Sequence, residues 1–189
     1  MRLFVLIGGP GSGKGTQCQK IVETFGWKHL STGEVFRDQI RRKTKLGLEI
    51  QHCVHGGNLV PDDLVIKVVE EALSHYPDST SGILLDGFPR TQYQAQQFKR
   101  YLGKNGQDIE KVIYLEAPIE ILWKRLKKRG LEDGRADDLE EKKIRHRMKL
   151  YEQETQSLLN FYQQDKKLYP VPADQSVEEV FQDIQHLID

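Results

Sequence analysis

The chain has 189 residues, enough for one domain with a substantial buried core. Lys and Arg together number 28, as do Asp and Glu, so no overall charge bias favours nucleic acid or a membrane surface. Two cysteines, Cys18 and Cys53, are too few for a disulfide framework or a zinc site. No apolar stretch approaches the roughly 20 residues that cross a bilayer. We therefore expect a soluble, cytoplasmic protein that binds neither nucleic acid nor membranes, and we expect a monomer.

The first predicted elements surround a phosphate-binding motif. The apolar run Leu3–Ile7 is typical of a buried strand, and Gln17–Phe25 has helical spacing. Between them lies the segment Gly8-Gly9-Pro10-Gly11-Ser12-Gly13-Lys14-Gly15-Thr16. Its glycines let backbone N–H groups turn inward around an anion, and the helix adds the positive end of its dipole. Lys14 supplies charge for the outer phosphates and Thr16 a hydroxyl suited to Mg²⁺, so the segment predicts a nucleoside triphosphate site.

Strand-like runs and helical segments alternate along the whole chain. The runs are Leu3–Ile7, Trp27–Leu30, Ile83–Leu85, Val112–Leu115 and Leu168–Val171. This alternation predicts a three-layer α/β fold, with a parallel sheet covered by helices on both faces. Residues 31 to 70 contain no strand-like run and predict a helical excursion over the sheet edge. Cys18 falls on the apolar stripe of the first helix, where we expect a small buried side chain.

A second motif follows the third strand-like run. It reads Asp86-Gly87-Phe88-Pro89-Arg90, with Gln94 one helical turn further on. Asp86 would lie at the carboxyl edge of the sheet beside the phosphate loop, where Mg²⁺ and its waters would sit. Arg90 offers a planar, bidentate phosphate donor. The Gln94 amide can both donate to and accept from a base edge.

Together these motifs resemble the adenylate kinases, in the short-lid branch of the nucleoside monophosphate kinases. The likeness rests on both motifs, on Ser31-Thr32-Gly33 with Arg37, and on Gly134-Arg135-Ala136-Asp137-Asp138. It implies a P-loop fold with a five-stranded parallel sheet of order 2-3-1-4-5, a helical monophosphate-binding insertion and a short lid. It also implies one kinase domain over residues 1–189, divided into a core (1–30, 61–127, 139–189), a monophosphate-binding region (31–60) and a lid (128–138).

The implied activity is reversible phosphoryl transfer from Mg·ATP to AMP, giving two ADP. The residues implied for ATP are Gly11, Ser12, Gly13, Lys14, Gly15, Thr16, Arg125, Arg129 and Gln175. Those implied for AMP are Thr32, Arg37, Asn58, Leu59, Val60, Gly87, Phe88, Pro89, Arg90, Gln94, Arg135 and Arg147. The implied catalytic residues are Lys14, Arg90, Arg129, Arg135 and Arg147, and the implied Mg²⁺ ligands are Thr16 and Asp86, directly or through water. Asp137 and Asp138 either orient the lid arginines or only balance local charge.

The last phosphate-binding arginine depends on helical phase, because this chain has one more residue after Asp138 than similar short-lid kinases. A count without a gap would place that arginine on His146. The apolar stripe that defines the buried face is Ile144, Met148, Tyr151, Leu158 and Tyr162. Arg147 lies about 60° from its centre, Arg145 about 100° on the other side, and His146 roughly opposite. The phase favours Arg147, with Arg145 as the alternative.

The alternative function is that of a UMP/CMP kinase, which shares nearly every motif. Proteins resembling that branch carry Ala at the position of Thr32 and Asn at that of Gln94. Both positions therefore favour AMP here, since a hydrogen-bonding site discriminates strongly against a base that leaves its polar groups unpaired. A catalytically silent nucleotide-binding module would lack the transfer arginines that this chain keeps.

Overall fold

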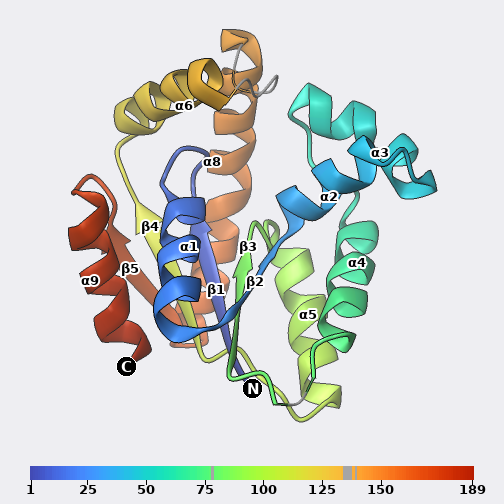
Figure 1. The fold of residues 1–189 in the computed structure, drawn as a ribbon, viewed down its shortest axis with the longest axis vertical. Helices are drawn as coiled ribbons and strands as arrows, with labels where there is room; N and C mark the ends of the chain where they lie inside the picture. Colours follow the sequence, from blue (N-terminus) through green and yellow to red (C-terminus); the bar gives the residue numbers. More distant parts are fainter. Residues whose placement is uncertain (78, 134–137, 139) are drawn as a thin grey trace.

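The computed structural model describes residues 1–77, 79–133, 138 and 140–189, and its centre is a five-stranded sheet (Figure 1). The strands are β1 (Arg2–Gly8), β2 (Lys28–Ser31), β3 (Gly82–Asp86), β4 (Lys111–Glu116) and β5 (Leu168–Pro172). Their order is β2-β3-β1-β4-β5, and all neighbours are parallel. The predicted order is therefore confirmed, and the predicted strand-like runs coincide with the strands to within one residue at each end.

Helices cover both faces of the sheet and extend beyond its carboxyl edge. They are α1 (Lys14–Phe25), α2 (Thr32–Arg41), α3 (Lys45–Gly56), α4 (Asp62–Ser74), α5 (Gln92–Lys104), α6 (Ile119–Asp133), α8 (Glu141–Gln164) and α9 (Val177–Ile188). One face packs on α1 and α9, and the other on α4, α5 and α8. The three-layer α/β prediction is thus confirmed.

The two layers form because β1 is apolar on both sides. Leu3, Val5 and Ile7 belong to the core cluster under α4, α5 and α8, whereas Phe4 and Leu6 belong to the cluster under α1 and α9. Successive side chains of a strand point to opposite faces, so one short apolar run fills both cores. Cys18, on α1, is fully buried in the second cluster, as predicted.

Two helical regions flank the carboxyl edge of the sheet (Figure 1). The excursion predicted over residues 31 to 70 is formed by α2 and α3, whose first turns are capped by the side chains of Ser31 and Thr44. It ends earlier than predicted, because α4 already packs on the core at the sheet face. On the other side, α6 packs against the start of α8 through Leu122 and Ile144. The chain from 128 to 133, predicted to belong to a lid, continues α6. Of the remaining predicted lid residues, 134–137 lie outside the described part of the chain and Asp138 lies within it.

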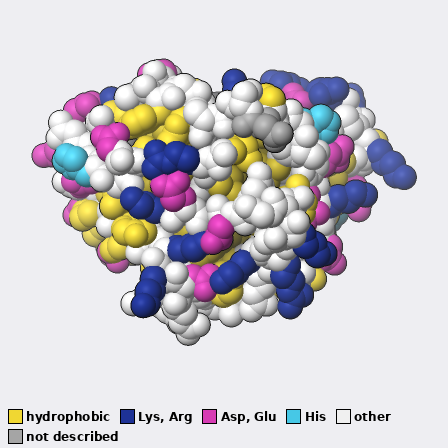
Figure 2. Space-filling view, turned by 90° about the horizontal axis from the view of Figure 1, so that it is seen from below, with side chains coloured by type: hydrophobic (Ala, Val, Ile, Leu, Met, Phe, Trp, Pro, Cys, Tyr) yellow, Lys and Arg dark blue, Asp and Glu magenta, His cyan; other side chains and the backbone are white. Residues whose placement is uncertain are grey.

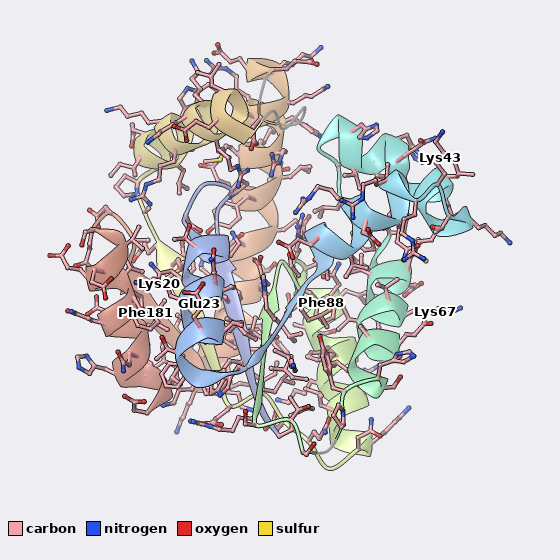
Figure 3. All side chains as sticks on the ribbon, in the orientation of Figure 1. Lys20, Glu23, Lys43, Lys67, Phe88 and Phe181 are labelled. Carbon is pink, nitrogen blue, oxygen red and sulfur yellow. The ribbon has the colours of Figure 1, made fainter. Side chains whose placement is uncertain are left out.

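The surface is mixed in charge. Figure 2 shows basic and acidic side chains interspersed over the end of the molecule at which the parallel strands begin, as expected from the equal totals of 28. Lys43 and Lys67 project outward from the helical side (Figure 3). Among the described residues, no helix combines the length and the apolar character that a membrane crossing requires.

Candidate functional site

Two adjoining cavities open at the carboxyl edge of the sheet. The larger, of about 640 Å³, lies over the loop between β1 and α1 and reaches α6 and α8. The smaller, of about 80 Å³, lies between α2, the α3–α4 connection and the loop after β3. Arg37, Arg90 and Arg147 line both cavities. Cationic side chains from three separate elements therefore meet where the two cavities join.

The loop between β1 and α1 has the geometry of an anion cradle. Gly13 precedes the first residue of α1 with φ 93°, a left-handed conformation that side chains disfavour. Lys14 begins the helix, and its Nζ donates hydrogen bonds to the carbonyl oxygens of Gly8 (2.6 Å) and Gly9 (3.0 Å). Lys14 lines the larger cavity, together with Gly11, Gly15 and Thr16. The helix N-terminus and this lysine thus present positive charge to the same space.

The pKa of Lys14 is lowered to about 8, chiefly by burial, while the nearby Asp86 carboxylate acts in the opposite direction. An anion bound against the amine would favour its charged form and raise the pKa again. Near pH 8 we therefore expect nucleotide binding to take up part of a proton. The uptake should vanish at pH values well below 8, where the lysine is already protonated.

Titration calorimetry in two buffers of different ionisation enthalpy measures this uptake directly. Lys14→Met should abolish it. Equal apparent enthalpies in both buffers at pH 8, after correction for protons taken up by the nucleotide itself, would contradict the lowered pKa.

Asp86 ends β3 at the floor of the larger cavity. Its Oδ2 accepts a hydrogen bond from Ser31 Oγ (3.3 Å) and lies 3.6 Å from His29 Nε2. Burial acts to raise the pKa of Asp86, but the contact with His29 and the charge of Lys14 outweigh it and lower the pKa. The carboxylate is therefore ionised, and Thr16 lines the same cavity. An anionic oxygen and a hydroxyl beside a phosphate cradle are a donor set that fits Mg²⁺.

Sequence reasoning did not single out His29, although the alternation of β2 gives a signal. His29 and Ser31 are two residues apart, so both side chains leave the strand on one face, and Ser31 pairs with Asp86 in the sheet. The Cys18 sulfur lies near the same two side chains. One possible metal-ligand atom from each of Cys18, His29 and Asp86 lies within 4.8 Å of the other two. Burial, followed by the charge of Asp86, raises the pKa of the Cys18 thiol well above its usual value. The protonated thiol therefore packs as a small apolar group.

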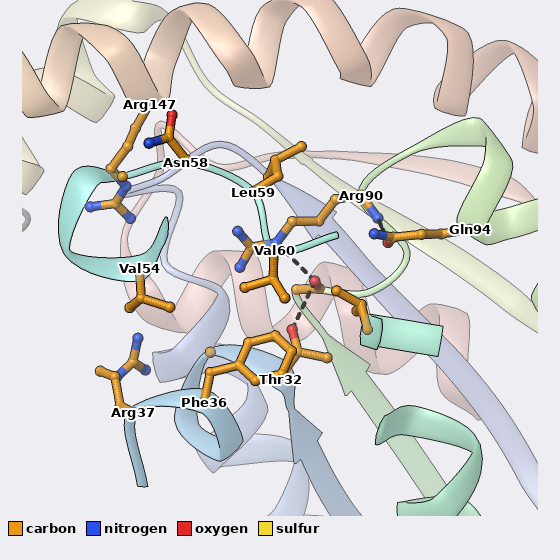
Figure 4. A pocket seen from close by; sticks show the side chains of 14 residues that line it. Thr32, Phe36, Arg37, Val54, Asn58, Leu59, Val60, Arg90, Gln94 and Arg147 are labelled. Atoms are coloured by element: carbon orange, nitrogen blue, oxygen red, sulfur yellow. Dashed lines mark hydrogen bonds between the residues drawn. The ribbon is translucent and has the colours of Figure 1, made fainter. Parts of the chain in front are cut away.

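The loop after β3 is folded tightly around Gly87. The carbonyl oxygen of Gly87 accepts from Thr32 Oγ1 (2.9 Å) and from Arg90 Nε (2.9 Å), as drawn in Figure 4. Gly87 has φ 75°, and a Cβ there would lie 2.9 Å from Thr32 Oγ1. Only glycine fits this position without strain. The loop thereby fixes Thr32 and Arg90 at the wall of the smaller cavity.

Gln94 lies in the wall of the smaller cavity, with 1% of its surface exposed. Its Oε1 accepts from the backbone N–H of Arg90 (2.7 Å), and its Nε2 donates to Asp62 Oδ1 (2.7 Å). Asp62 was not singled out from the sequence. Phe88 is 1% exposed and packs edge-on against Phe98 with ring centroids 5.0 Å apart, so its side chain anchors the loop in the core (Figure 3). Only the Phe88 backbone is left to contact a ligand.

Asp138 joins two of the predicted arginines. Its side chain is fully buried, with Oδ2 accepting from Arg129 Nε (2.6 Å) and Oδ1 from Arg147 Nη1 (2.6 Å). Arg129 lines the larger cavity, as does Arg147. Arg145 instead pairs with Glu141, and its side chain is 70% exposed. The geometry thus brings Arg147 to the cavities and leaves Arg145 outside, whereas Arg135 falls outside the described residues.

The other predicted site residues differ in how closely they approach the cavities. Arg125 lines the larger one and donates to the carbonyl oxygen of Ala173 (2.8 Å). Asn58, Leu59 and Val60 line the smaller one, and Pro89 the larger. Ser12 is buried beneath Lys14, and Gln175 lines neither cavity because its amide donates to Pro172 and Asp183.

His146 does not point away from the molecule as the helical phase predicts. It is half-buried, and its Nε2 lies 2.7 Å from Asn58 Oδ1. The α3–α4 connection runs along this side of α8, with a Cβ on Gly57 falling 2.8 Å from Arg147 Cγ. The excursion therefore covers the flank of α8 that the stripe alone leaves to solvent.

Fold and site together define the class of P-loop phosphotransferases, here with two adjoining cavities that share three arginines. The family model described as "Adenylate kinase" matches residues 6–167. This chain belongs to the adenylate kinase family.

Curated relatives agree over nearly the full length. An adenylate kinase of Bacteroides thetaiotaomicron is 40% identical over 186 residues, covering 98% of this chain and 97% of the relative. One of Phocaeicola vulgatus is 41% identical over 181 residues, covering 96% and 95%. One of a Cyanothece species is 38% identical over 189 residues, covering 100% and 96%.

Proposed function

We propose that this chain acts as an adenylate kinase, transferring a phosphoryl group reversibly from Mg·ATP to AMP and giving two ADP. The observation that carries the proposal is the meeting of two cavities at Arg37, Arg90 and Arg147. Two anionic nucleotides placed tail to tail would bring their phosphates to that junction. Catalysis then consists of alignment and neutralisation of charge, since the attacking AMP oxygen is already anionic.

We propose ATP in the larger cavity and AMP in the smaller one. The ATP phosphates would lie in the Gly11–Thr16 loop, with Lys14 bridging toward the transferred group and Arg125 stacking on the adenine. The backbone of Gln175 would also reach the adenine. AMP would be held by residues of α2, the α3–α4 connection and the loop after β3. Arg129, Arg135 and Arg147 would surround the transferring group.

Thr16 and Asp86 would hold Mg²⁺, directly or through water, and the ion would supply further neutralisation of the phosphate charge. We propose that the chain works as a monomeric cytoplasmic enzyme, with a core (1–30, 61–127, 139–189), a monophosphate-binding region (31–60) and a lid (128–138). The monophosphate-binding region and the lid would close over the core and exclude water from the site. Without this closure, water could attack the bound ATP and hydrolyse it.

A coupled assay tests the proposal by offering AMP, CMP, UMP and GMP in turn with Mg·ATP. AMP should be by far the best acceptor, and two ADP should form for each AMP consumed. Preference for CMP or UMP would replace the proposal with the UMP/CMP kinase alternative.

Gln94→Asn should narrow the ratio of kcat/KM for AMP to that for CMP. The shorter amide cannot keep its hydrogen bonds to Arg90 and Asp62 while also facing the base, so the preference for adenine should fall about tenfold. The ratio is measured with the same coupled assay. Because cytosine presents the same acceptor and amino group to Gln94 as adenine does, an unchanged ratio would show that Gln94 does not set the preference for adenine over cytosine.

A further inference from the structure

Asp62 is a half-buried carboxylate at the first position of α4, in direct contact with Gln94. Both of its oxygens accept hydrogen bonds from the start of α5. Oδ1 accepts from Gln94 Nε2 at 2.7 Å, and Oδ2 accepts from Thr91 Oγ1 at 2.9 Å. The proposed function gives this residue no role.

These contacts determine which way the Gln94 amide faces. An ionised carboxylate only accepts hydrogen bonds and a backbone N–H only donates them. The amide nitrogen must therefore face Asp62, and the amide oxygen must face the N–H of Arg90, at 2.7 Å (Figure 4). The reversed amide would set oxygen against carboxylate and NH₂ against N–H, which leaves buried polar groups unpaired. Asp62 and Arg90 thus hold the amide in one orientation from two sides.

The fixed amide keeps one hydrogen on Nε2 and one lone pair on Oε1 for a ligand. A 6-aminopurine presents N1 as an acceptor and its amino group as a donor, which matches this pair. A 6-oxopurine presents a protonated N1 and an acceptor oxygen, which is the reverse. Cytosine presents the same pattern as adenine, with N3 as the acceptor and its amino group as the donor. A 6-aminopurine and a 6-oxopurine differ only at this edge, so comparing these two purines tests how the amide is oriented.

We propose that Asp62 is the positioning residue that makes the AMP site selective for 6-amino over 6-oxo purines. The inference rests on the proposed binding of AMP in the smaller cavity. Asp62 acts through Gln94, because its two oxygens are taken by Gln94 and Thr91. Without the carboxylate, the amide can rotate and pair with the reversed edge.

The test compares AMP with inosine monophosphate as acceptors for Asp62→Asn. The substituted amide keeps one acceptor oxygen but carries no charge, and it can also turn its NH₂ toward Gln94. The orientation of Gln94 is then no longer imposed, so the ratio of the two kcat/KM values should fall about tenfold, mainly through a higher KM for AMP and a lower one for inosine monophosphate. The KM for ATP should not change. If Asp62 only links α4 to α5 structurally, its substitution should lower kcat/KM for both monophosphates in the same proportion. An unchanged ratio would therefore overturn the proposal.

Asp63→Asn is the matched control. This neighbouring carboxylate also lies in the first turn of α4, but it is exposed and accepts from Tyr93 Oη (3.1 Å). The Asp63→Asn substitution removes the same charge from the same end of α4 without touching Gln94. The ratio of kcat/KM for AMP to that for inosine monophosphate should therefore equal that of the unsubstituted chain. If Asp62→Asn fails to fold, Asp62→Ser keeps a residue suited to a helix start while removing the carboxylate, and the same ratio decides.

Gln94→Leu separates failure of this inference from failure of the proposed function. If Gln94→Leu lowers the ratio and Asp62→Asn does not, Asp62 is not the positioning residue and the AMP site stands. If neither substitution changes it, Gln94 does not read the base and the proposed AMP site falls together with the inference.

Discussion

Replacing Lys14 with Met should lower kcat for ADP formation by on the order of 10³-fold while the chain stays folded. The ammonium group lies in the larger cavity at the start of α1, where it donates to the carbonyl oxygens of Gly8 and Gly9. Phosphates compete for the same donors, so the amine can turn from the loop to the transferring group. Met has similar length and no charge, so it removes the neutralisation together with the two hydrogen bonds to the loop carbonyls.

Stability should not fall in this variant. Burial is the main cause of the lowered pKa of Lys14, which means that the folded chain disfavours the charged amine. A thermal melt of the ligand-free variant should therefore give a Tm equal to or above that of the unsubstituted chain.

Lys20→Met is the matched control on the same helix. Lys20 pairs with Glu178, lies 5.0 Å from the centre of the Phe181 ring (Figure 3) and lines neither cavity. Its turnover should match that of the unsubstituted chain. Turnover of Lys14→Met within a few-fold of this control would remove Lys14 from the transfer step.

The parts of the fold that sequence predicts well are those fixed by neighbouring residues. Strand β1, the glycine-rich loop and α1 follow one another directly, and the alternation of Leu3 to Ile7 already specifies a strand buried on both faces. The position of Asp86 follows for the same reason, since a carboxylate after a buried strand lies at the carboxyl edge. The family resemblance added the strand order, which no local pattern determines.

The contacts that sequence missed join residues far apart in the chain. Gln94 and Asp62 are 32 residues apart, and His146 and Asn58 are 88 apart. No periodicity within either segment indicates the partner. Phe88 shows the opposite error, in which sequence predicts a contact that the side chain does not make. Its place in the motif predicts contact with a ligand, but its ring is packed against Phe98. A motif fixes where the backbone passes, and long-range packing decides which side chains face the ligand.

Replacing Arg147 with Ala should lower kcat by on the order of 10²–10³-fold. Arg147 lines both cavities, so its guanidinium is placed where the two sets of phosphates would meet. It also donates to the fully buried Asp138, which Arg129 shares. Loss of Arg147 therefore removes a cation from the junction and leaves Asp138 less neutralised, so that Arg129 is drawn more strongly to it and away from the ATP site.

Arg145→Ala is the control that helical phase and geometry together provide. Arg145 and Arg147 are two residues apart on α8, but the Arg145 side chain is 70% exposed and that of Arg147 20%. Arg145 pairs with Glu141 at the surface, where an ion pair contributes little, so this variant should keep full turnover. Steady-state kinetics on both variants decide between the two arginines. If Arg145→Ala is the slow one, α8 must turn on its axis when nucleotides bind, because in the described arrangement Arg147 lines both cavities and Arg145 lines neither.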